Sequence, residues 1–152
     1  MRYLLLVFTV LIALSASAQS EVLRTKHFNL GQNGLAIEGY DPVSYFEGKP
    51  AEGSAKHSIR HQGVLYYFTT AAHLEAFKKD PARYEPQYGG WCAFAMGDYG
   101  EKVSVDPETY KILDGKLYLF YNAFFTNTLP KWNNNEQNLK KAGDINWKNT
   151  FK

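Results

Sequence analysis

The fold is decided by residues 57–81, which read HSIRHQGVLYYFTTAAHLEAFKKDP. Gln62-Gly63 is a two-residue turn signal, because glycine readily adopts the positive φ that tight hairpin turns need. The alternation on either side of it predicts a β-hairpin over residues 57–68. The predicted pairs are His61 with Val64, Ile59 with Tyr66, and His57 with Phe68, and these six side chains share the more apolar face. A three-residue turn would shift the pairing by one residue and exchange the faces.

A helix is predicted directly after this hairpin, over Ala71–Lys79. Thr69 or Thr70 supplies a side-chain oxygen that caps the first turn. The helix ends at Asp80-Pro81, because proline cannot continue the hydrogen-bond ladder. Its inward-facing side chains are Leu74 and Phe77.

A second hairpin is predicted over Thr109–Tyr121, with Asp114-Gly115 as a strong type I′ turn signal. One face carries Tyr110, Ile112, Leu117, Leu119 and Tyr121. Beyond Asn122 the composition becomes polar and helical, and Pro130 is expected to separate two helical pieces. The packing candidates there are Phe124, Phe125, Leu129, Trp132 and Leu139. The sequence therefore predicts one small α+β domain, an antiparallel sheet of two hairpins with short helices packed on one side.

Composition narrows the class of protein. The chain has 152 residues, 45% of them hydrophobic and 21% charged, which is ordinary for one globular domain. A formal charge of +2 is too small for nucleic-acid binding by phosphate neutralisation. A single cysteine excludes an intramolecular disulfide, a four-cysteine zinc site and a Cys-x-x-Cys pair. Phosphate-loop, serine-hydrolase and His-Glu-x-x-His motifs are absent from the sequence.

Residues 1–18 have the pattern of an export signal. Arg2 is followed by an apolar run, Leu4–Leu14, and by the small residues of Ala16-Ser17-Ala18. The run is too short for a membrane span, which needs about 20 apolar residues. We therefore expect cleavage after Ala18, a periplasmic or secreted protein without a membrane span, and a short lead-in over residues 19–35.

Residues 36–150 resemble the YHS domain, with a C-terminal helical extension. The matching pieces are Tyr40-Asp41-Pro42-Val43, Gly63-x-x-Tyr66-Tyr67-Phe68 and Phe77-x-x-Asp80-Pro81-x-x-Tyr84. The continuation, from Tyr88-Gly89-Gly90-Trp91-Cys92-Ala93 to Asp114-Gly115-Lys116-Leu117-Tyr118-Leu119, is similar to exported, stand-alone bacterial YHS proteins. Versions fused to copper-transporting ATPases imply a role in binding copper or a similar metal ion.

Metal-associated YHS domains carry cysteines at three places where this chain has Ser44, Thr69 and His73. Imidazole remains a good ligand for copper or zinc, whereas hydroxyls are poor ligands for soft ions. The resemblance therefore implies a metal site built on His73. The register above places His57 at the same end of the hairpin, and Cys92 and Met96 are the further candidate ligands, which together would favour Cu(I).

The leading hypothesis is thus an exported, non-catalytic protein that binds a transition-metal ion such as copper, for metal handling or sensing. Two alternatives stay open. An aromatic pocket would bind a small organic ligand or cofactor, and its candidate residues are Tyr40, Tyr45, Tyr66, Tyr67 and Tyr88. An enzyme or enzyme accessory would use Cys92 as a reactive thiol, whereas a buried, inert thiol is the simpler interpretation of that residue.

Overall fold

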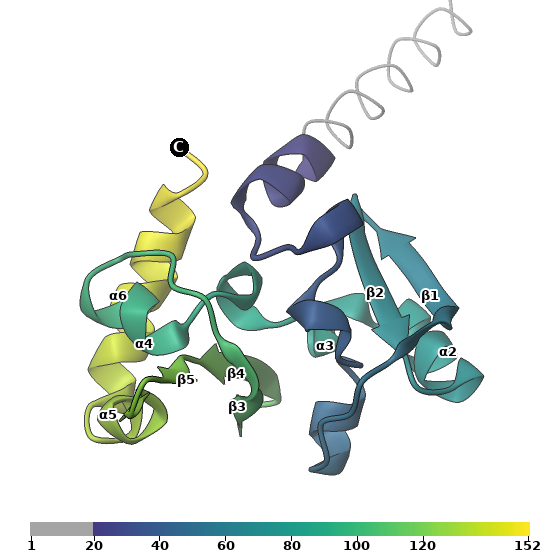
Figure 1. Cartoon of the computed structure of the whole chain (residues 1–152). Helices are drawn as coiled ribbons and strands as arrows, with labels where there is room; N and C mark the ends of the chain where they lie inside the picture. Colours follow the sequence, from purple (N-terminus) through teal and green to yellow (C-terminus); the bar gives the residue numbers. More distant parts are fainter. Residues whose placement is uncertain (1–19) are drawn as a thin grey trace, which may run out of the picture.

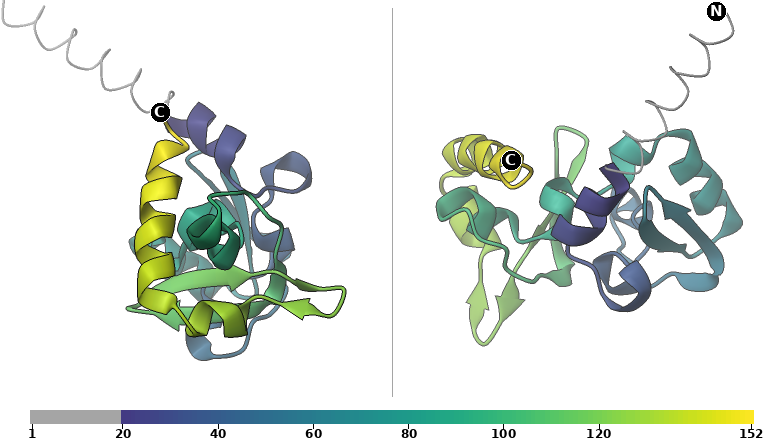
Figure 2. Two further views of the ribbon diagram at one scale, coloured as in Figure 1. Left: turned by 90° about the vertical axis from the view of Figure 1, so that its left-hand side faces the viewer. Right: turned by 90° about the horizontal axis from the view of Figure 1, so that it is seen from above.

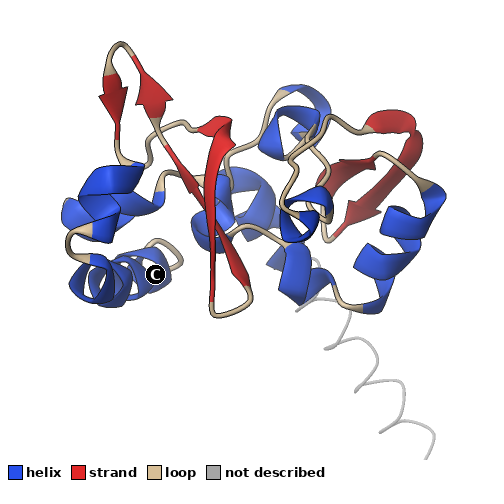
Figure 3. Cartoon of the chain, turned by 90° about the horizontal axis from the view of Figure 1, so that it is seen from below, coloured by secondary structure: helices blue, strands red, loops and turns tan. Residues whose placement is uncertain are grey.

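A computed structural model of the chain describes residues 20–152, and the predicted export signal lies outside this range. As predicted, the architecture is α+β (Figures 1 and 3). The helices are α2 (Ala71–Lys79), α3 (Pro81–Tyr84), α4 (Ala93–Asp98), α5 (Leu129–Asn133) and α6 (Glu136–Asn149), and residues 20–27 are also helical. The strands are β1 (Ser54–His61), β2 (Val64–Phe68), β3 (Asp106–Leu113), β4 (Lys116–Phe120), β5 (Asn122–Ala123) and β6 (Thr126–Asn127). The 3-10 turns are η1 (Gln32–Gly34), η2 (Ile37–Gly39), η3 (Ser44–Glu47) and η4 (Gln87–Gly90).

Both predicted hairpin turns are confirmed. Gln62 and Gly63 have φ of 46° and 83°, and Asp114 and Gly115 have φ of 52° and 70°, as type I′ turns require. Within the described residues, the strands form separate two-stranded sheets, β1–β2, β3–β4 and β5–β6, rather than one sheet.

The register of the first hairpin is confirmed near its turn and wrong farther away. His61 pairs with Val64 and Ile59 with Tyr66, but an irregularity in β1 makes Ser54, not His57, the partner of Phe68. The Ser58 hydroxyl donates to the carbonyl of Ala55 at 2.9 Å. This bond within β1 competes with the backbone hydrogen bonds between the two strands. It lies where β1 has extra residues relative to β2, and these residues move His57 out of the position opposite Phe68.

Strand β4 lies between two hydrophobic cores. Leu117 and Leu119 belong to the first core, together with side chains of β2 and α2. Tyr118 and Phe120 belong to the second core, where Trp132 of α5 is fully buried. Because successive side chains of a strand point to opposite faces, β4 is covered on both. The predicted one-sided helical layer is therefore wrong: α2 and α3 lie on one side of β3–β4, and α4, α5 and α6 on the other (Figures 1 and 2).

Two predicted packing residues are not packed. Phe124 and Phe125 form the tip of the β5–β6 hairpin and are 89% and 113% exposed. Trp132 and Leu139 are buried as predicted. Pro130 lies in the first turn of α5, where a missing backbone N–H costs nothing, so Asn134 and Asn135 separate the last two helices instead.

We expect that replacing both Phe124 and Phe125 by residues that favour this turn will stabilise the protein. Both residues have positive φ, 48° and 62°, which costs a bulky residue roughly 1–2 kcal/mol. Phe124→Asn with Phe125→Gly supplies the preferred turn residues, and we expect the free energy of unfolding to rise by about 1 kcal/mol in urea denaturation. The control, Phe124→Ala with Phe125→Ala, removes the rings but keeps the strain and should change little. An unstabilised Asn-Gly variant would contradict this account.

Candidate functional site

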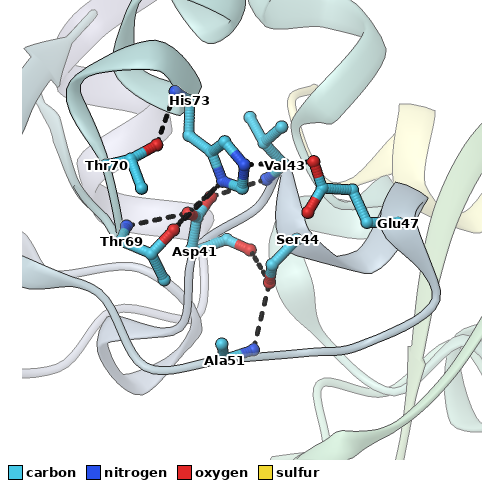
Figure 4. A network of polar contacts seen from close by, with 8 residues as sticks. All are labelled: Asp41, Val43, Ser44, Glu47, Ala51, Thr69, Thr70 and His73. Carbon is cyan, nitrogen blue, oxygen red and sulfur yellow. Dashed lines mark hydrogen bonds and ion pairs between the residues drawn. The ribbon is translucent and has the colours of Figure 1, made fainter.

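The candidate site lies where the loop before η3 meets the start of α2 (Figure 4). Thr70 caps α2 as predicted, because its hydroxyl oxygen accepts the backbone N–H of His73 at 3.1 Å. This cap fixes His73 in the first turn of the helix. The residues before η3 supply Asp41, whose side chain is fully buried.

Asp41 is the centre of the network. Its Oδ1 accepts the backbone N–H of Val43 at 2.9 Å, the side-chain-to-backbone bond by which aspartate stabilises turns. Its Oδ2 accepts the backbone N–H and the hydroxyl of Thr69, both at 2.8 Å. A buried carboxylate needs such compensation for the lost contact with water. Asp41 thus joins two segments 28 residues apart in the sequence.

His73 is held between two carboxylates. Its Nδ1 lies 2.6 Å from Asp41 Oδ2, and its Nε2 lies 3.1 Å from Glu47 Oε1. The hydrogen-bond network assigns the proton on Nδ1, because a carboxylate can only accept. When Nε2 of His73 is unprotonated, it and the Glu47 oxygen are both acceptors and repel each other. A proton or a metal cation between these two atoms makes their short separation favourable. The His73 side chain is 16% exposed and that of Glu47 is 62% exposed, so ions reach this side of the ring.

Ser44, Thr69 and His73 are brought together around Asp41. Thr69 and His73 contact its carboxylate, and the Ser44 hydroxyl donates to its backbone carbonyl at 2.7 Å. Ser44 Oγ also accepts the N–H of Ala51 at 3.1 Å. Both hydrogen bonds of the Ser44 hydroxyl are thus made to backbone groups. They hold the loop in place, so this oxygen is not available as a metal ligand.

Glu47 was not predicted as a site residue. It ends η3, 26 residues before His73 in the sequence. In the sequence, Glu47 is marked only by its position shortly after the Asp41-Pro42-Val43 motif. That position does not indicate that the Glu47 side chain contacts α2. The fold of η3 against α2 creates the contact.

Within residues 20–152, none of the other predicted ligands makes a hydrogen bond or ion pair with His73. His57 lies in the irregular part of β1, and its side chain makes no hydrogen bond or ion pair with residues 20–152. Met96 belongs to the second core. Cys92 precedes α4 and is fully buried, with its sulfur accepting the N–H of Tyr121 at 3.3 Å and lying 3.4 Å from the Thr128 hydroxyl. A site that combines His73 with this thiol and thioether would have to bridge the β3–β4 hairpin.

The buried tyrosines serve packing and hydrogen bonding. Tyr45 donates to the carbonyl of Pro107 at 2.7 Å, Tyr66 to Glu85 at 2.8 Å and Tyr88 to Asp144 at 2.9 Å. Burial is the largest cause that raises the pKa of each of these phenols above its usual value. Tyr45 and Tyr66 belong to the first core and Tyr88 to the second.

Comparisons with protein-family models, with curated proteins and with solved structures gave no match. Within residues 20–152, no three or more His, Cys, Asp or Glu side chains form a group suited to a metal ion. Over the same residues, every helix is too short or too polar to cross a membrane.

Proposed function

We propose that this is an exported, non-catalytic protein of the YHS type that binds a divalent transition-metal ion, Cu(II) or Zn(II). The ligands are Nε2 of His73 and the carboxylate of Glu47. The observation that carries the proposal is the approach of His73 Nε2 to a carboxylate oxygen of Glu47 at 3.1 Å, with the other ring nitrogen already bound to a buried carboxylate. Metal-binding histidines commonly donate their second ring N–H to a carboxylate, which fixes the ring and raises its basicity.

The spacing of the two donor atoms supports this assignment. Ligands about 2.1 Å from a zinc ion at a tetrahedral angle lie about 3.4 Å apart, close to the observed 3.1 Å. The exposed Glu47 side chain can adjust by this small amount. Water or a ligand from outside the chain would fill the remaining coordination positions, so binding is expected to be moderate and exchangeable, as suits metal handling or sensing.

The donor set favours Cu(II) or Zn(II) over Cu(I). Imidazole and carboxylate are nitrogen and oxygen ligands, whereas Cu(I) prefers thiolate and thioether sulfur. The sulfur atoms of Cys92 and Met96 are buried with the second core and α4, away from His73. The proposal therefore differs from a sulfur-rich copper site.

The test is calorimetric titration of the metal-free protein with ZnCl₂ and CuCl₂. We expect a dissociation constant between about 10 μM and 1 mM, and at least tenfold weaker binding in His73→Ala. Glu47→Gln keeps its size but loses the charge and is expected to weaken binding by about threefold to tenfold. His57→Ala and Glu75→Gln are matched controls outside the site and should bind as the wild type does. Binding no tighter than about 1 mM, or unchanged in His73→Ala, would reject the proposal.

Metal binding at Nε2 also displaces a proton whenever the ring is protonated. We therefore expect the affinity to fall at acidic pH and the titration to release protons. Titrations in two buffers of different ionisation enthalpy measure this release. An affinity that does not change between about pH 5 and 8 would place the ion elsewhere on the protein.

A further inference from the structure

A cavity of about 370 Å³ lies beside the second core, between α4, the loop that follows it, the β5–β6 hairpin and α5. Its volume falls near the lower end of the range of small-molecule sites, about 300–1,000 Å³. Phe94, Tyr99 and Tyr121 supply aromatic walls. Phe94 and Tyr99 are in edge-to-face contact at 6.3 Å, and Tyr99 is 53% exposed. These rings thus leave apolar surface that a planar ligand would cover.

The polar groups on the buried side of the cavity need no hydrogen bond from a ligand. This side is lined by Cys92 and Thr128, which are both buried. The Thr128 hydroxyl donates to the carbonyl of Tyr121 at 3.0 Å, and the N–H of Tyr121 donates to the sulfur of Cys92 at 3.3 Å. Since these groups satisfy one another, the apolar part of a ligand can lie against them without breaking a hydrogen bond.

The outer side of the cavity is cationic. Lys131 of α5 lines it, with its ammonium nitrogen 5.8 Å from the centre of the Phe94 ring. Lys131 forms no ion pair with residues 20–152, and the hydroxyl of Thr126 forms no hydrogen bond with them. An ammonium group without an ion-pair partner and a hydroxyl without a hydrogen-bond partner within residues 20–152, both beside an aromatic cavity, are complementary to an anionic group.

We propose that this cavity binds a small planar organic anion, an aromatic ring system that carries one carboxylate or sulfonate. The ring lies between Phe94 and Tyr121 over the buried thiol, and the anionic group lies at Lys131 and Thr126. The site is independent of the metal site at His73 and uses none of its residues.

The test compares two fluorescent probes that share one aromatic skeleton. 8-Anilinonaphthalene-1-sulfonate is anionic, and N-phenyl-1-naphthylamine is its uncharged counterpart. We expect the purified protein to bind the anionic probe with a dissociation constant below about 100 μM and the neutral probe more weakly. Absence of saturable binding of the anionic probe up to about 1 mM overturns the proposal.

Three variants assign the site. Lys131→Met keeps the apolar stem and should weaken binding of the anionic probe about threefold to fivefold, the effect of one partly exposed ion pair, and leave the neutral probe unchanged. Lys141→Met, on α6, is the matched control and should change neither. Thr126→Trp fills the mouth of the cavity and should weaken both probes. Thermal unfolding of each variant confirms that it folds. Equal effects of Lys131→Met and Lys141→Met, or full binding in a folded Thr126→Trp, place the probe elsewhere and overturn the proposal.

Discussion

Asp41→Ala is expected to lower the free energy of unfolding by about 3–5 kcal/mol, because it removes several hydrogen bonds to one buried carboxylate and leaves their donors unsatisfied. The Asp41 carboxylate is fully buried and accepts the N–H groups of Val43 and Thr69, the Thr69 hydroxyl and Nδ1 of His73. Alanine leaves these donors without an acceptor. It also frees the loop before η3 from the start of α2.

Urea denaturation at neutral pH measures this effect. Asp98→Ala is the matched control, because Asp98 is exposed at the end of α4, and we expect a change within about 0.5 kcal/mol. Asp41→Asn should be nearly as harmful as alanine, because its amide group would direct N–H donors at the N–H of Thr69. If Asp41→Ala cost no more than Asp98→Ala, the network in Figure 4 would not hold the two segments together.

A steep loss of stability is expected in alkaline solution. Tyr45, Tyr66 and Tyr88 are at most 3% exposed, and burial favours their neutral form, which raises the pKa of each phenol in the folded state. In the unfolded chain a tyrosine loses its proton near pH 10. Above that pH the unfolded state binds fewer protons than the folded state, so stability is complete below about pH 10 and falls as the pH rises.

Each such tyrosine contributes a slope of about 1.4 kcal/mol per pH unit, so the three together contribute about 4 kcal/mol per unit above pH 10. Urea denaturation between pH 8 and 11.5 measures the slope. Each of Tyr45→Phe, Tyr66→Phe and Tyr88→Phe loses a hydrogen bond and should be less stable at pH 8 by about 1 kcal/mol. Each should nevertheless show a slope smaller by about 1.4 kcal/mol per pH unit. A slope unchanged in all three variants would mean that these phenols ionise without unfolding the protein.

Much of the fold could be predicted because its signals are local. Gln62-Gly63 and Asp114-Gly115 specify their turns through backbone conformation alone. Thr70 and Asp80-Pro81 likewise specify the two ends of α2. These residues act within four or five positions of the chain, so the sequence contains the whole interaction.

The errors arose where the outcome depended on distant partners. Alternation predicted His57 opposite Phe68, but an irregularity in β1 moved it away. Phe124 and Phe125 were predicted to pack because they are apolar, yet the short β5–β6 hairpin extends them into solvent. A hydrophobic side chain favours burial, but its presence in the sequence does not show whether the folded chain provides a surface to cover it.

The candidate sites divide in the same way. His73 was singled out through the resemblance to the YHS domain, and the strand and the helix cap predicted beside it are present in the structure. Its contact with Glu47, its separation from Cys92 and the cavity beside Lys131 arise from segments that meet only after the chain folds around β4. Such meetings depend on how whole faces pack and on the chain entropy lost in closing long loops, and no short stretch of residues contains that information.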